Sequence, residues 1–388
     1  MEEWKEYKLG DICKSNINSY SEKDNWSFVN YLDTGNITEN KISDIQFIDL
    51  SSESLPSRAR RKVQLNDIIY STVRPNQKHF GIIKNKPENF LVSTGFAVLH
   101  TNKTIANPNF IFYNLIQNEN TESLHAIAEQ TTSAYPAIKP SDIENLSIKV
   151  PPLPTQQKIA AILSSLDDKI ELNNKINTNL EQQAQALFKN WFVDFEPFGG
   201  KMPEEWKMGK LSDIADITMG QSPDGKSYNE EGIGTVFYQG RAEFGNRFPT
   251  RRLFTTEPKR IAKKFDTLMS VRAPVGDTNI ANEDCCIGRG LAAIHSKANH
   301  QSFVHYTVLA LRSQLDVFNG EGTVFGCINR DALNNMEVII PAKSDLDKFE
   351  EIVASFDADI FNRSEENSRL KDTRDSLLPK LMNGEIEV

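Results

Sequence analysis

Apolar residues recur three or four positions apart along two long stretches of this chain. The first stretch runs from Thr155 to Trp191, with apolar positions at Ile159, Ile162, Leu163, Leu166, Ile170, Ile176, Leu180, Ala184, Leu187 and Trp191. Its start is marked by Pro151, Pro152 and Pro154, which we expect to precede the helix, with Thr155 as its N-cap. No proline or glycine follows until Pro197. The pattern predicts one unbroken helix, about 55 Å long, with a narrow seam for a partner helix.

The second stretch repeats this pattern between Ser344 and Leu381. Its apolar positions are Phe349, Ile352, Val353, Phe356, Ile360, Leu370, Leu377 and Leu381. The two stretches align at one constant offset of 190 residues, which matches Ile162 with Ile352, Asp167 with Asp357, Ile170 with Ile360, Leu180 with Leu370 and Leu187 with Leu377. The constant offset indicates an internal duplication.

The duplication extends into the segments before each helix. Trp4, Leu9, Asp11 and Ile12 recur as Trp206, Leu211, Asp213 and Ile214. Asp67, Ser71 and Pro75 recur as Asp266, Ser270 and Pro274, and Gly95, Ala97 and His100 recur as Gly290, Ala292 and His295. Residues 13–60 and 215–259 differ freely. The chain is therefore two copies of one unit, a mixed domain followed by a helix, with a shared frame and divergent loops.

The first domain, 1–150, has the pattern of an α+β fold. We expect strands over 67–73, 90–100 and 146–150 and a helix over 110–117. Asn, Ser and Thr crowd residues 15–57, where we expect long loops. Residues 151–198 form the first helix and a linker, since FEPFGGKMP at 195–203 is rich in proline and glycine. The second domain then covers 199–341 and the last helix 342–388.

Bulk composition places the chain among ordinary globular proteins. A length of 388 residues suffices for two or three domains with their own cores. There is no long apolar run or secretory leader, so we expect a soluble cytoplasmic protein. The four cysteines form no Cys-x-x-Cys pair and are expected as free thiols. A zinc site would have to use Cys285, Cys286, His295, His300 and His305, whose spacing fits no familiar ligand pattern.

The net charge of −9 disfavours a nucleic-acid partner, but its distribution reverses that impression. The helical segments 151–198 and 344–388 carry −2 and −6 of it, so the domains are nearly neutral. Arg58, Arg60, Arg61 and Lys62 lie close together, and residues 241–264 hold eight basic side chains against two acidic ones. Arg60 and Arg61 align with Lys259 and Arg260. A solvated surface explains one such cluster equally well, but recurrence in both copies favours contact with phosphates.

Four separated runs carry a resemblance to a known family. They are PLPTQQKIAAILSSLDDKIELNN, MGQSPDGKSYNEEGIGTVFYQG, MSVRAPVGD and LLPKLMNGEI. Together they resemble the DNA-specificity subunit of type I restriction-modification systems, over the whole chain. The resemblance implies two target-recognition domains separated by two long antiparallel coiled-coil helices. Residues 1–150 would read one half of a split duplex target and 199–341 the other half.

The resemblance also implies partners, and the basic and aromatic residues of the sequence supply candidates for binding them. The partners would be double-stranded DNA, two methyltransferase subunits that bear S-adenosylmethionine, and a restriction subunit that translocates and cleaves DNA, with no membrane involved and no cofactor bound by this chain. The candidate DNA-binding residues are Arg58, Arg60, Arg61, Lys62, Arg74, Lys78, Gln239, Arg241, Arg247, Arg251, Arg252, Lys259, Arg260, Arg272 and Arg289. The candidate partner-binding residues, which fit an aromatic anchor, are Trp191, Phe192, Phe195 and Phe198. Closure of the local core explains each of these aromatic residues, taken singly, about as well. One departure is that the arginine of Ser270-Val271-Arg272-Ala273-Pro274 is shifted by one in Ser71-Thr72-Val73-Arg74-Pro75, which puts equivalent roles for Arg74 and Arg272 in doubt.

Motifs for catalysis are weak or missing in the sequence. Asn107-Pro108-Asn109-Phe110 and Val150-Pro151-Pro152 do not fit the base-holding element of an adenine methyltransferase. Pro223-Asp224 with Glu257-Pro258-Lys259 resembles a nuclease metal site, but Pro258 would disrupt its strand. Gly288-Arg289-Gly290 lacks the lysine and serine of a phosphate-binding loop. Together with this lack of catalytic motifs, the resemblance implies a non-catalytic scaffold that binds a bipartite, asymmetric duplex sequence and recruits methylating subunits to it. The alternative is a coiled-coil adaptor that joins two protein-binding domains.

Overall fold

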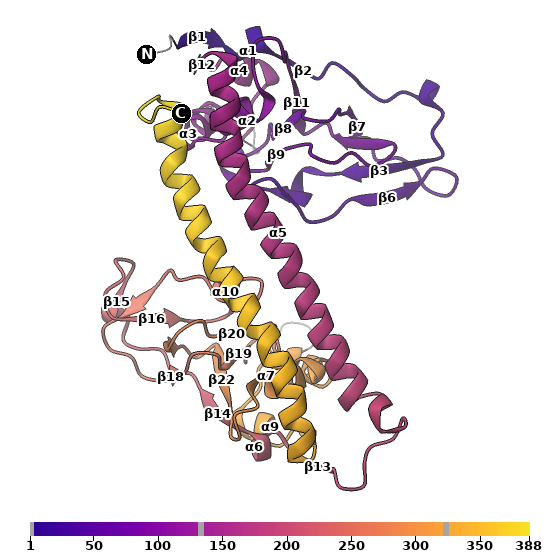
Figure 1. The fold of residues 1–388 in the computed structure, drawn as a ribbon, viewed down its shortest axis with the longest axis vertical. Coiled ribbons are helices and arrows are strands. Elements are labelled where there is room, and N and C mark those ends of the chain that lie inside the picture. The colour runs from indigo at the N-terminus through magenta and orange to yellow at the C-terminus, as the bar shows by residue number, and fades with distance from the viewer. Residues whose placement is uncertain (1–3, 131–135, 321–325) are drawn as a thin grey trace. The chain divides into compact units, whose positions relative to one another are not determined.

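The chain folds as two compact units that share two long helices. The computed structural model describes residues 4–130, 136–320 and 326–388. The first unit comprises Met1–Glu171 with Asn367–Val388, and the second comprises Leu172–Glu366. Helices α5 (Leu153–Phe192) and α10 (Lys343–Met382) each contribute one part to either unit (Figure 1). Among the described residues, no helix is long and apolar enough to cross a membrane.

Both long helices confirm the prediction from hydrophobic spacing. Each begins and ends within two residues of the predicted bounds. The expectation that Pro154 precedes the helix is wrong, because α5 already begins at Leu153. A proline is tolerated in the first turn, since the backbone N–H groups there have no partner within the helix. Pro379 lies inside the last turns of α10.

The helices run antiparallel within each unit, as expected. In the first unit Arg374 of α10 pairs with Asp167 of α5 at 2.7 Å, and Lys158 lies 3.2 Å from the carbonyl oxygen of Val388. In the second unit the amide of Asn173 donates to the carboxylate of Glu366 at 2.7 Å, and the amide of Asn177 donates to the hydroxyl of Ser364 at 3.3 Å. Residue numbers therefore rise along one helix as they fall along the other.

The repeat of the two helices is visible in their burial. Residues 161–170 and 351–360 have the same sequence of buried, half-buried and exposed positions. Leu163 and Val353 occupy the seam, whereas Ile162 and Ile352 are 36 % and 41 % exposed. Our placement of these two isoleucines in the seam is wrong, because adjacent helical residues lie about 100° apart and only one of them faces the partner helix.

The domain of the first unit is built mainly from short strands. Within its described residues, two strands pair antiparallel as β1 (Lys5–Lys8) and β12 (Ser147–Val150). One sheet has the order β6 (Gln46–Asp49), β3 (Phe28–Leu32), β10 (Phe90–Ser93), β7 (Ala59–Lys62). The other has the order β2 (Cys13–Ser15), β11 (Phe96–Thr101), β8 (Ile68–Ser71), β9 (Phe80–Ile82), and β4 (Ile37–Thr38) pairs with β5 (Lys41–Ile42). The shorter helices are α1 (Leu9–Ile12), α2 (Pro108–Leu115), α3 (Asn118–Glu129) and α4 (Pro140–Glu144).

Among the described residues, the second unit repeats the two main sheets and the terminal strand pair, with one additional edge strand and without a counterpart of the β4–β5 pair. Within its described residues, β13 (Lys207–Lys210) pairs with β23 (Glu337–Ile340). One sheet has the order β14 (Ala215–Met219), β22 (Leu291–Ser296), β19 (Thr267–Ser270), β20 (Thr278–Ile280). The other has the order β15 (Tyr228–Asn229), β17 (Phe254–Thr255), β16 (Thr235–Tyr238), β21 (Cys285–Ile287), β18 (Ile261–Ala262). The helices are α6 (Leu211–Ile214), α7 (Gln301–Ala310), α8 (Arg312–Asp316) and α9 (Arg330–Asn334).

Matching strands have matching neighbours in the two units. Strand β10 pairs with β3 in parallel and with β7 antiparallel, and β21 pairs in the same way with β16 and β18. Arg61 lies opposite Val92, and the carbonyl oxygen of Arg260 accepts from the backbone N–H of Ile287 at 2.9 Å. The predicted duplication, and the alignment of Arg61 with Arg260, are thereby confirmed.

Two predictions for the first domain need correction. The apolar run 90–100 is two strands, β10 and β11, which belong to different sheets. The chain turns between them at Gly95, where a Cβ atom would lie 2.8 Å from the side chain of Thr34. The region 15–57 is not only loops, because it contains β3 to β6. Strand β3 was hidden because polar Asn30 interrupts its otherwise apolar and aromatic residues, a pattern that does not distinguish strand from loop.

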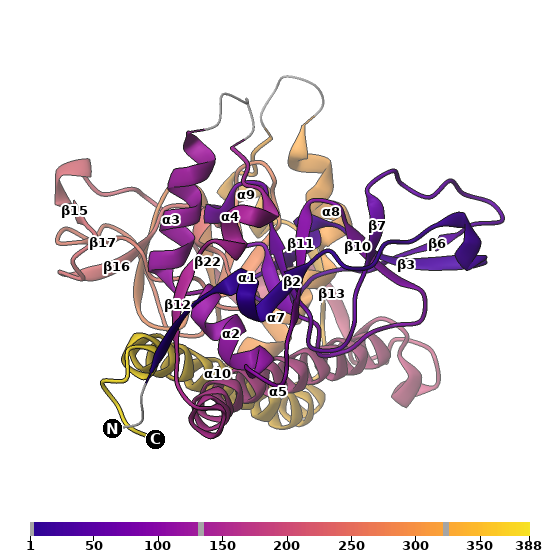
Figure 2. The same ribbon diagram turned by 90° about the horizontal axis from the view of Figure 1, so that it is seen from above.

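Each domain packs onto the helices through its own apolar core. In the first unit the core includes Phe110, Leu163 and Leu381, with Trp4, Ile386 and Val388 at its border. The ends of the described chain therefore meet in this unit, where Gly384 approaches Trp4 (Figure 2). In the second unit the helix-facing core includes Phe188, Phe303 and Phe349.

Candidate nucleic-acid interface

Several candidate residues of the second unit gather where the strands of one sheet end. Gln239 follows β16, Arg289 follows β21, and Arg260 precedes β18. Because β16 and β21 are parallel and β18 is antiparallel to β21, all three residues lie at the same end of the sheet. We call the residues at this position the sheet-end edge. Arg272 joins it, since the N–H of Val271 donates to the carbonyl oxygen of Gly290 at 2.9 Å.

Glycines allow the chain segments of this edge to approach closely. A Cβ atom at Gly288 would lie 2.8 Å from the carbonyl oxygen of Gln239, and one at Gly220 would lie 2.1 Å from that of Gly288. Both distances are shorter than van der Waals contact, so any larger residue would separate the segments. The backbone N–H of Arg289 also lies 3.3 Å from the hydroxyl of Ser222. The edge is thus a compact backbone platform that presents the side chains around it.

The sheet-end edge of the second unit carries several basic side chains that are not held in ion pairs. Lys259, Arg260, Arg272 and Arg289 are all exposed. Within the described ranges, none of their side chains takes part in an ion pair or hydrogen bond. Phosphate groups of a nucleic acid are bound by such exposed cations through charge and counterion release.

The first unit forms an equivalent edge with fewer cations. Asp33 follows β3, and the N–H of Thr94, after β10, donates to the carbonyl oxygen of Arg58 at 2.8 Å. Arg58 is exposed and acts on Asp33 through its charge. Burial alone raises the pKa of Asp33, but hydrogen bonds from Thr34, Tyr31 and Ser93, together with the charge of Arg58, leave that pKa below its usual value. Charged groups of both signs therefore lie at this edge.

The arginines Arg74 and Arg272 do not occupy equivalent positions. Val73 forms a backbone bridge with Ala137, whereas in the second unit Arg272 itself bridges with Cys327. Arg74 is one residue further on, with a φ of 47° in the left-handed region. The shift expected from the sequence is therefore a real difference in structure.

Other candidate cations are held by carboxylates within their own unit. Arg247 pairs with Glu181 of α5 and Asp357 of α10, and its side chain is only 12 % exposed. The carboxylates of the two long helices neutralise and cover Arg247, which disfavours contact with a phosphate, and the expected contact stays a prediction. Further restrained pairs among the described residues are Lys62 with Asp24, Lys78 with Glu39, Arg241 with Asp277, Arg251 with Glu283, and Arg252 with Glu230 and Glu243.

The remaining two residues of the first basic cluster lie in β7. Arg60 and Arg61 are both half-buried. The Nε of Arg61 is buried without a hydrogen-bond partner in the described part of the chain. Both side chains therefore have less freedom than Lys259 and Arg260, their counterparts in sequence.

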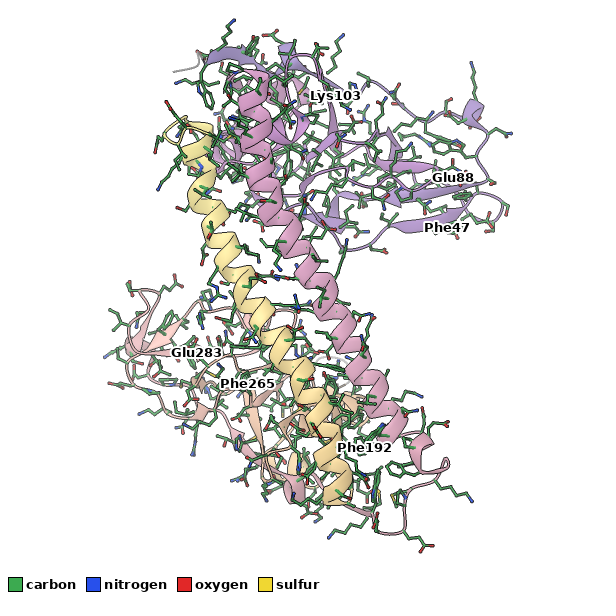
Figure 3. All side chains as sticks on the ribbon, viewed as in Figure 1. Phe47, Glu88, Lys103, Phe192, Phe265 and Glu283 are labelled. Atoms are coloured by element: carbon green, nitrogen blue, oxygen red, sulfur yellow. The ribbon has the colours of Figure 1, made fainter. Side chains whose placement is uncertain are left out.

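The four aromatic residues expected to bind a partner lie at the end of α5 and just beyond it. Phe192 is 3 % exposed and contacts Phe303 and Phe349 at ring centroid distances of 4.9 and 5.0 Å (Figure 3). Trp191, Phe195 and Phe198 are partly buried against the same core. The ring of Phe192 closes the core of the second unit, which favours a structural role for this residue. Contact of the four residues with a partner stays a prediction.

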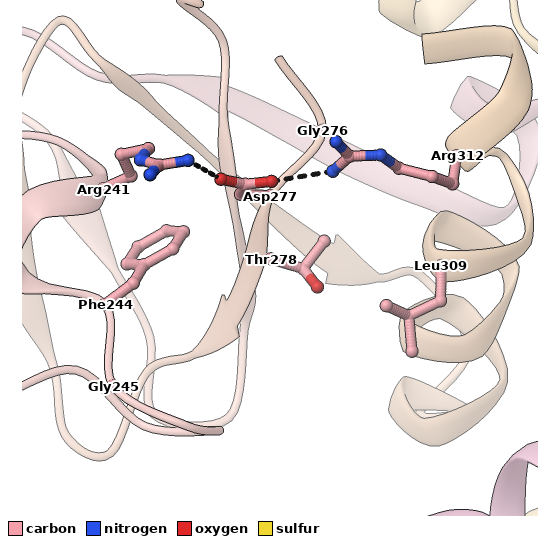
Figure 4. Close-up of a pocket in the computed structure, with 8 residues that line it drawn as sticks. All are labelled: Arg241, Phe244, Gly245, Gly276, Asp277, Thr278, Leu309 and Arg312. Atoms are coloured by element: carbon pink, nitrogen blue, oxygen red, sulfur yellow. Dashed lines mark hydrogen bonds and ion pairs between the residues drawn. The ribbon is translucent and has the colours of Figure 1, made fainter. Parts of the chain in front are cut away.

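A cavity of about 420 Å³ in the second unit contains two residues that sequence reasoning missed. Asp277 accepts from Arg241 and, at 2.7 Å, from Arg312 of α8 (Figure 4). No sequence signal singles out Arg312, because it lies outside the basic clusters and its partner is 35 residues earlier. Asp277 does lie in the family-like run MSVRAPVGD, which was the available signal.

The residues of the conceivable zinc site are buried thiols and histidines, of which two pair with carboxylates. Cys285 and Cys286 are buried in β21, and burial raises the pKa of the Cys285 thiol. His295 pairs with Asp266 at 2.6 Å and His300 with Asp347 at 2.7 Å. Across residues 4–130, 136–320 and 326–388, no group of three or more His, Cys, Asp or Glu is placed to hold a metal.

Comparison with known proteins agrees with this architecture. The sequence profile of the type I restriction modification DNA specificity domain matches residues 1–182 and 203–371. The chain is 29 % identical to the HindI type I restriction enzyme specificity subunit of Haemophilus influenzae, with full coverage of both chains. It is 30 % identical to a Methanocaldococcus jannaschii protein described as the MjaX specificity subunit, over 100 % of this chain and 94 % of the relative.

A solved structure supports the fold independently of close sequence similarity. The type I restriction-modification S subunit of M. genitalium aligns over 98 % of this chain and 96 % of its own, with a TM-score of 0.65 at 16 % identity. The duplicated domains, the long helices and the profile match over both repeats lead to one conclusion. The chain belongs to the type I restriction-modification DNA specificity family, whose members are non-catalytic components that recognise DNA.

Proposed function

We propose that this subunit binds a bipartite, asymmetric duplex target, with each domain reading one half. The observation that carries the proposal is the recurrence of the sheet-end edge in both units, on strands that pair identically. The residues that differ most between the repeats, 13–60 and 215–259, supply part of each edge. Two domains that share a backbone fold but differ in the side chains at this edge are suited to recognise two different DNA sequences.

The two kinds of residue at these edges suit different contacts with DNA. Exposed Lys259, Arg260, Arg272 and Arg289 would contact phosphates and supply sequence-independent affinity. Side chains such as Gln239, which follows β16 at the same edge, would reach base edges in the major groove. Affinity and specificity would therefore depend on different residues of the same surface.

The proposal includes a complex with two methyltransferase subunits and a restriction subunit, acting in the cytoplasm. Support for two equal methyltransferase sites comes from Ile162 and Ile352, which are exposed at equivalent positions of the two long helices. An exposed isoleucine on each helix suits the centre of a small apolar contact. This chain would bind no cofactor itself, and S-adenosylmethionine would be held by the methyltransferase subunits.

A binding assay across salt concentrations tests DNA recognition. The purified complex should retard a target duplex in a mobility-shift assay, with affinity that falls steeply as salt rises and exceeds that for unrelated duplexes. A coiled-coil adaptor would give no sequence-specific complex. Such a result would overturn the proposal.

A domain replacement tests whether the two halves are read independently. The chain with residues 1–150 replaced by those of a relative would be expressed with its methyltransferase, and modified bases in the host genome would be mapped. Only one half of the methylated sequence should change. A change in both halves would show that the two domains do not read separately.

A further inference from the structure

The cavity of the second unit presents two arginines that share one carboxylate. Arg241 belongs to the 3-10 turn η6 (Arg241–Glu243) that follows β16, and Arg312 belongs to α8. Both donate from Nη1 to Asp277, one to each carboxylate oxygen. Phe244 and Leu309 complete the walls (Figure 4). The cavity lies beside the sheet-end edge, because only Gly240 separates Gln239 from Arg241.

Asp277 is itself fixed by the backbone around it. Its N–H donates to the hydroxyl of Ser270 at 2.9 Å, and that hydroxyl donates to the carbonyl oxygen of Pro274 at 2.6 Å. The preceding Gly276 has a φ of 91°, a conformation that residues with a side chain rarely adopt. A carboxylate held in this way can orient a flexible arginine.

The two arginines differ in the donors that they leave available. Arg312 also uses Nε, which lies 3.0 Å from Asp316, so both ends of its guanidinium are engaged. Arg241 uses Nη1 alone, and its side chain is 51 % exposed. In the described part of the chain, nothing engages the Nε and Nη2 donors of Arg241. These two donors form a parallel pair that is free to meet a partner with two adjacent acceptors.

We propose that Arg241 reads a guanine of the half-site bound by the second domain. Guanine presents O6 and N7 as neighbouring acceptors in the major groove, and the bidentate arginine contact is the commonest specific contact to a base. Asp277 would act as a positioning residue that holds the guanidinium before DNA arrives, and Arg312 would anchor Asp277. This inference rests on the proposed function and specifies one base of the target and the residue that reads it.

The shared carboxylate favours a base edge over a phosphate as the partner of Arg241. Asp277 offsets the charge of Arg241 and would repel a phosphate placed beside it. The neutral acceptors of guanine meet no such repulsion. Phosphates have better ligands at the same edge, where Arg272 and Arg289 carry no carboxylate partner within the described residues.

Mapping of modified bases tests the inference in the complete complex. The wild-type target should contain a guanine in the half that changes when residues 199–341 are exchanged. Arg241→Ala should lower discrimination for this guanine roughly 10- to 100-fold and leave the other half unchanged. Asp277→Asn should relax the same position, because Arg241 would no longer be oriented. As a matched control, Asp216→Asn breaks the ion pair of Lys297, which is not a candidate DNA-binding residue, and should leave the target unaltered.

A second variant separates base reading from charge. Arg241→Lys keeps the positive charge but lacks the forked donor pair, so it should relax the guanine with overall affinity nearly unchanged. Two results would overturn the inference: equal weakening on all sequences with the target preserved, or unaltered discrimination in both the Asp277 and Arg241 variants. Failure of the proposed function would look different, because the wild-type complex itself would then show no sequence preference.

Discussion

The hydroxyl of Tyr113 in α2 donates to the carboxylate of Asp167 in α5 at 2.6 Å. The second unit has the equivalent hydrogen bond, in which Tyr306 of α7 donates to Asp357 of α10 at 3.4 Å. In the first unit Arg374 also donates to Asp167, at 2.7 Å. Each domain is thus tied to the helix that follows it in sequence by a tyrosine and an aspartate at equivalent positions.

Removal of the Tyr113 hydroxyl should destabilise the first unit. Tyr113→Phe keeps the ring but takes a donor from a largely buried carboxylate, which should lower the free energy of unfolding by about 1–2 kcal/mol. Urea denaturation would measure the loss. Tyr306→Phe is the matched control and should cost less, because its bond is longer and Asp357 keeps the Ser302 hydroxyl at 2.7 Å. An equal or larger loss in the control would contradict this assignment.

Hydrophobic spacing predicted the long helices well because their seam recurs over many turns. One residue assigned to the wrong face of the helix, such as Ile162, changes little in a pattern of that length. Strand β3 was missed because a five-residue strand offers no comparable repetition, and because its partner β10 is about 60 residues away. The constant offset between repeats was a stronger signal than any local pattern, since it is unaffected by strand length.

The sequence predicted where basic residues lie along the chain, but not which of them are free of ion pairs and can therefore bind DNA. Arg247 and Lys259 are indistinguishable in a count of basic residues. Arg247 pairs with Glu181 and Asp357, which are 66 and 110 residues away, and no local pattern reveals such partners. Lys259 is exposed at the sheet-end edge. Which cations remain open is therefore a property of the tertiary structure.

Substitution of the open cations should weaken binding to all duplexes alike. Replacing Lys259 and Arg260 by Ala removes two phosphate ligands, so the slope of log affinity against log salt should become shallower by about two. When Arg60→Ala and Arg61→Ala are added, the total decrease in this slope should be at most about four. Binding titrations on target and unrelated duplexes would measure both slopes. Loss of discrimination at unchanged affinity would instead place these side chains on base edges.

Charged residues at the equivalent isoleucines should impair assembly with the methyltransferase. Ile162→Asp and Ile352→Asp place a carboxylate in the proposed apolar contact, and each should remove one partner site. Light scattering of the complex would report one bound methyltransferase for either single variant and none for the double variant. Ser165→Asp, at a polar exposed position one turn further along α5, is the control. Two bound subunits in the double variant would show that the contact lies elsewhere.

A buried histidine should make the second unit sensitive to acid. Burial, with a contribution from the charge of Arg247, holds the pKa of His305 well below its ordinary value of 6.5. The unfolded chain therefore binds a proton more readily than the folded chain, so stability is present above about pH 6.5 and is lost as pH falls below it. The loss should approach about 1.4 kcal/mol per pH unit.

The first repeat suggests the variant that tests this prediction. Phe112 precedes Tyr113 as His305 precedes Tyr306, so His305→Phe introduces the residue that the other repeat uses. The free energy of unfolding would be measured from pH 7 to pH 5 for both proteins. The difference between them cancels the titration of other groups, including Glu350 and Asp357. A difference that does not change with pH would show that His305 is not responsible.

The length of the helices should set the unread gap between the two half-sites. Four residues inserted near Asn177 add roughly 6 Å and about 40° of rotation to α5, since four residues slightly exceed one turn. The seam stays approximately in register, so the helices should still pair. A second variant with a matching insertion at Asn367, the equivalent position of α10, lengthens both helices and avoids a bulge in one of them.

At a rise of about 3.4 Å per base pair, either insertion should widen the gap by one or two pairs, and by fewer if the helices are inclined to the DNA axis. The half-sites themselves should not change, because the sheet-end edges lie outside the inserted segments. Mapped methylation in cells that express each variant with its partners would report the spacing directly. Methylation at the original spacing only, by a variant that remains folded and assembled, would mean that contacts outside the helices fix the gap.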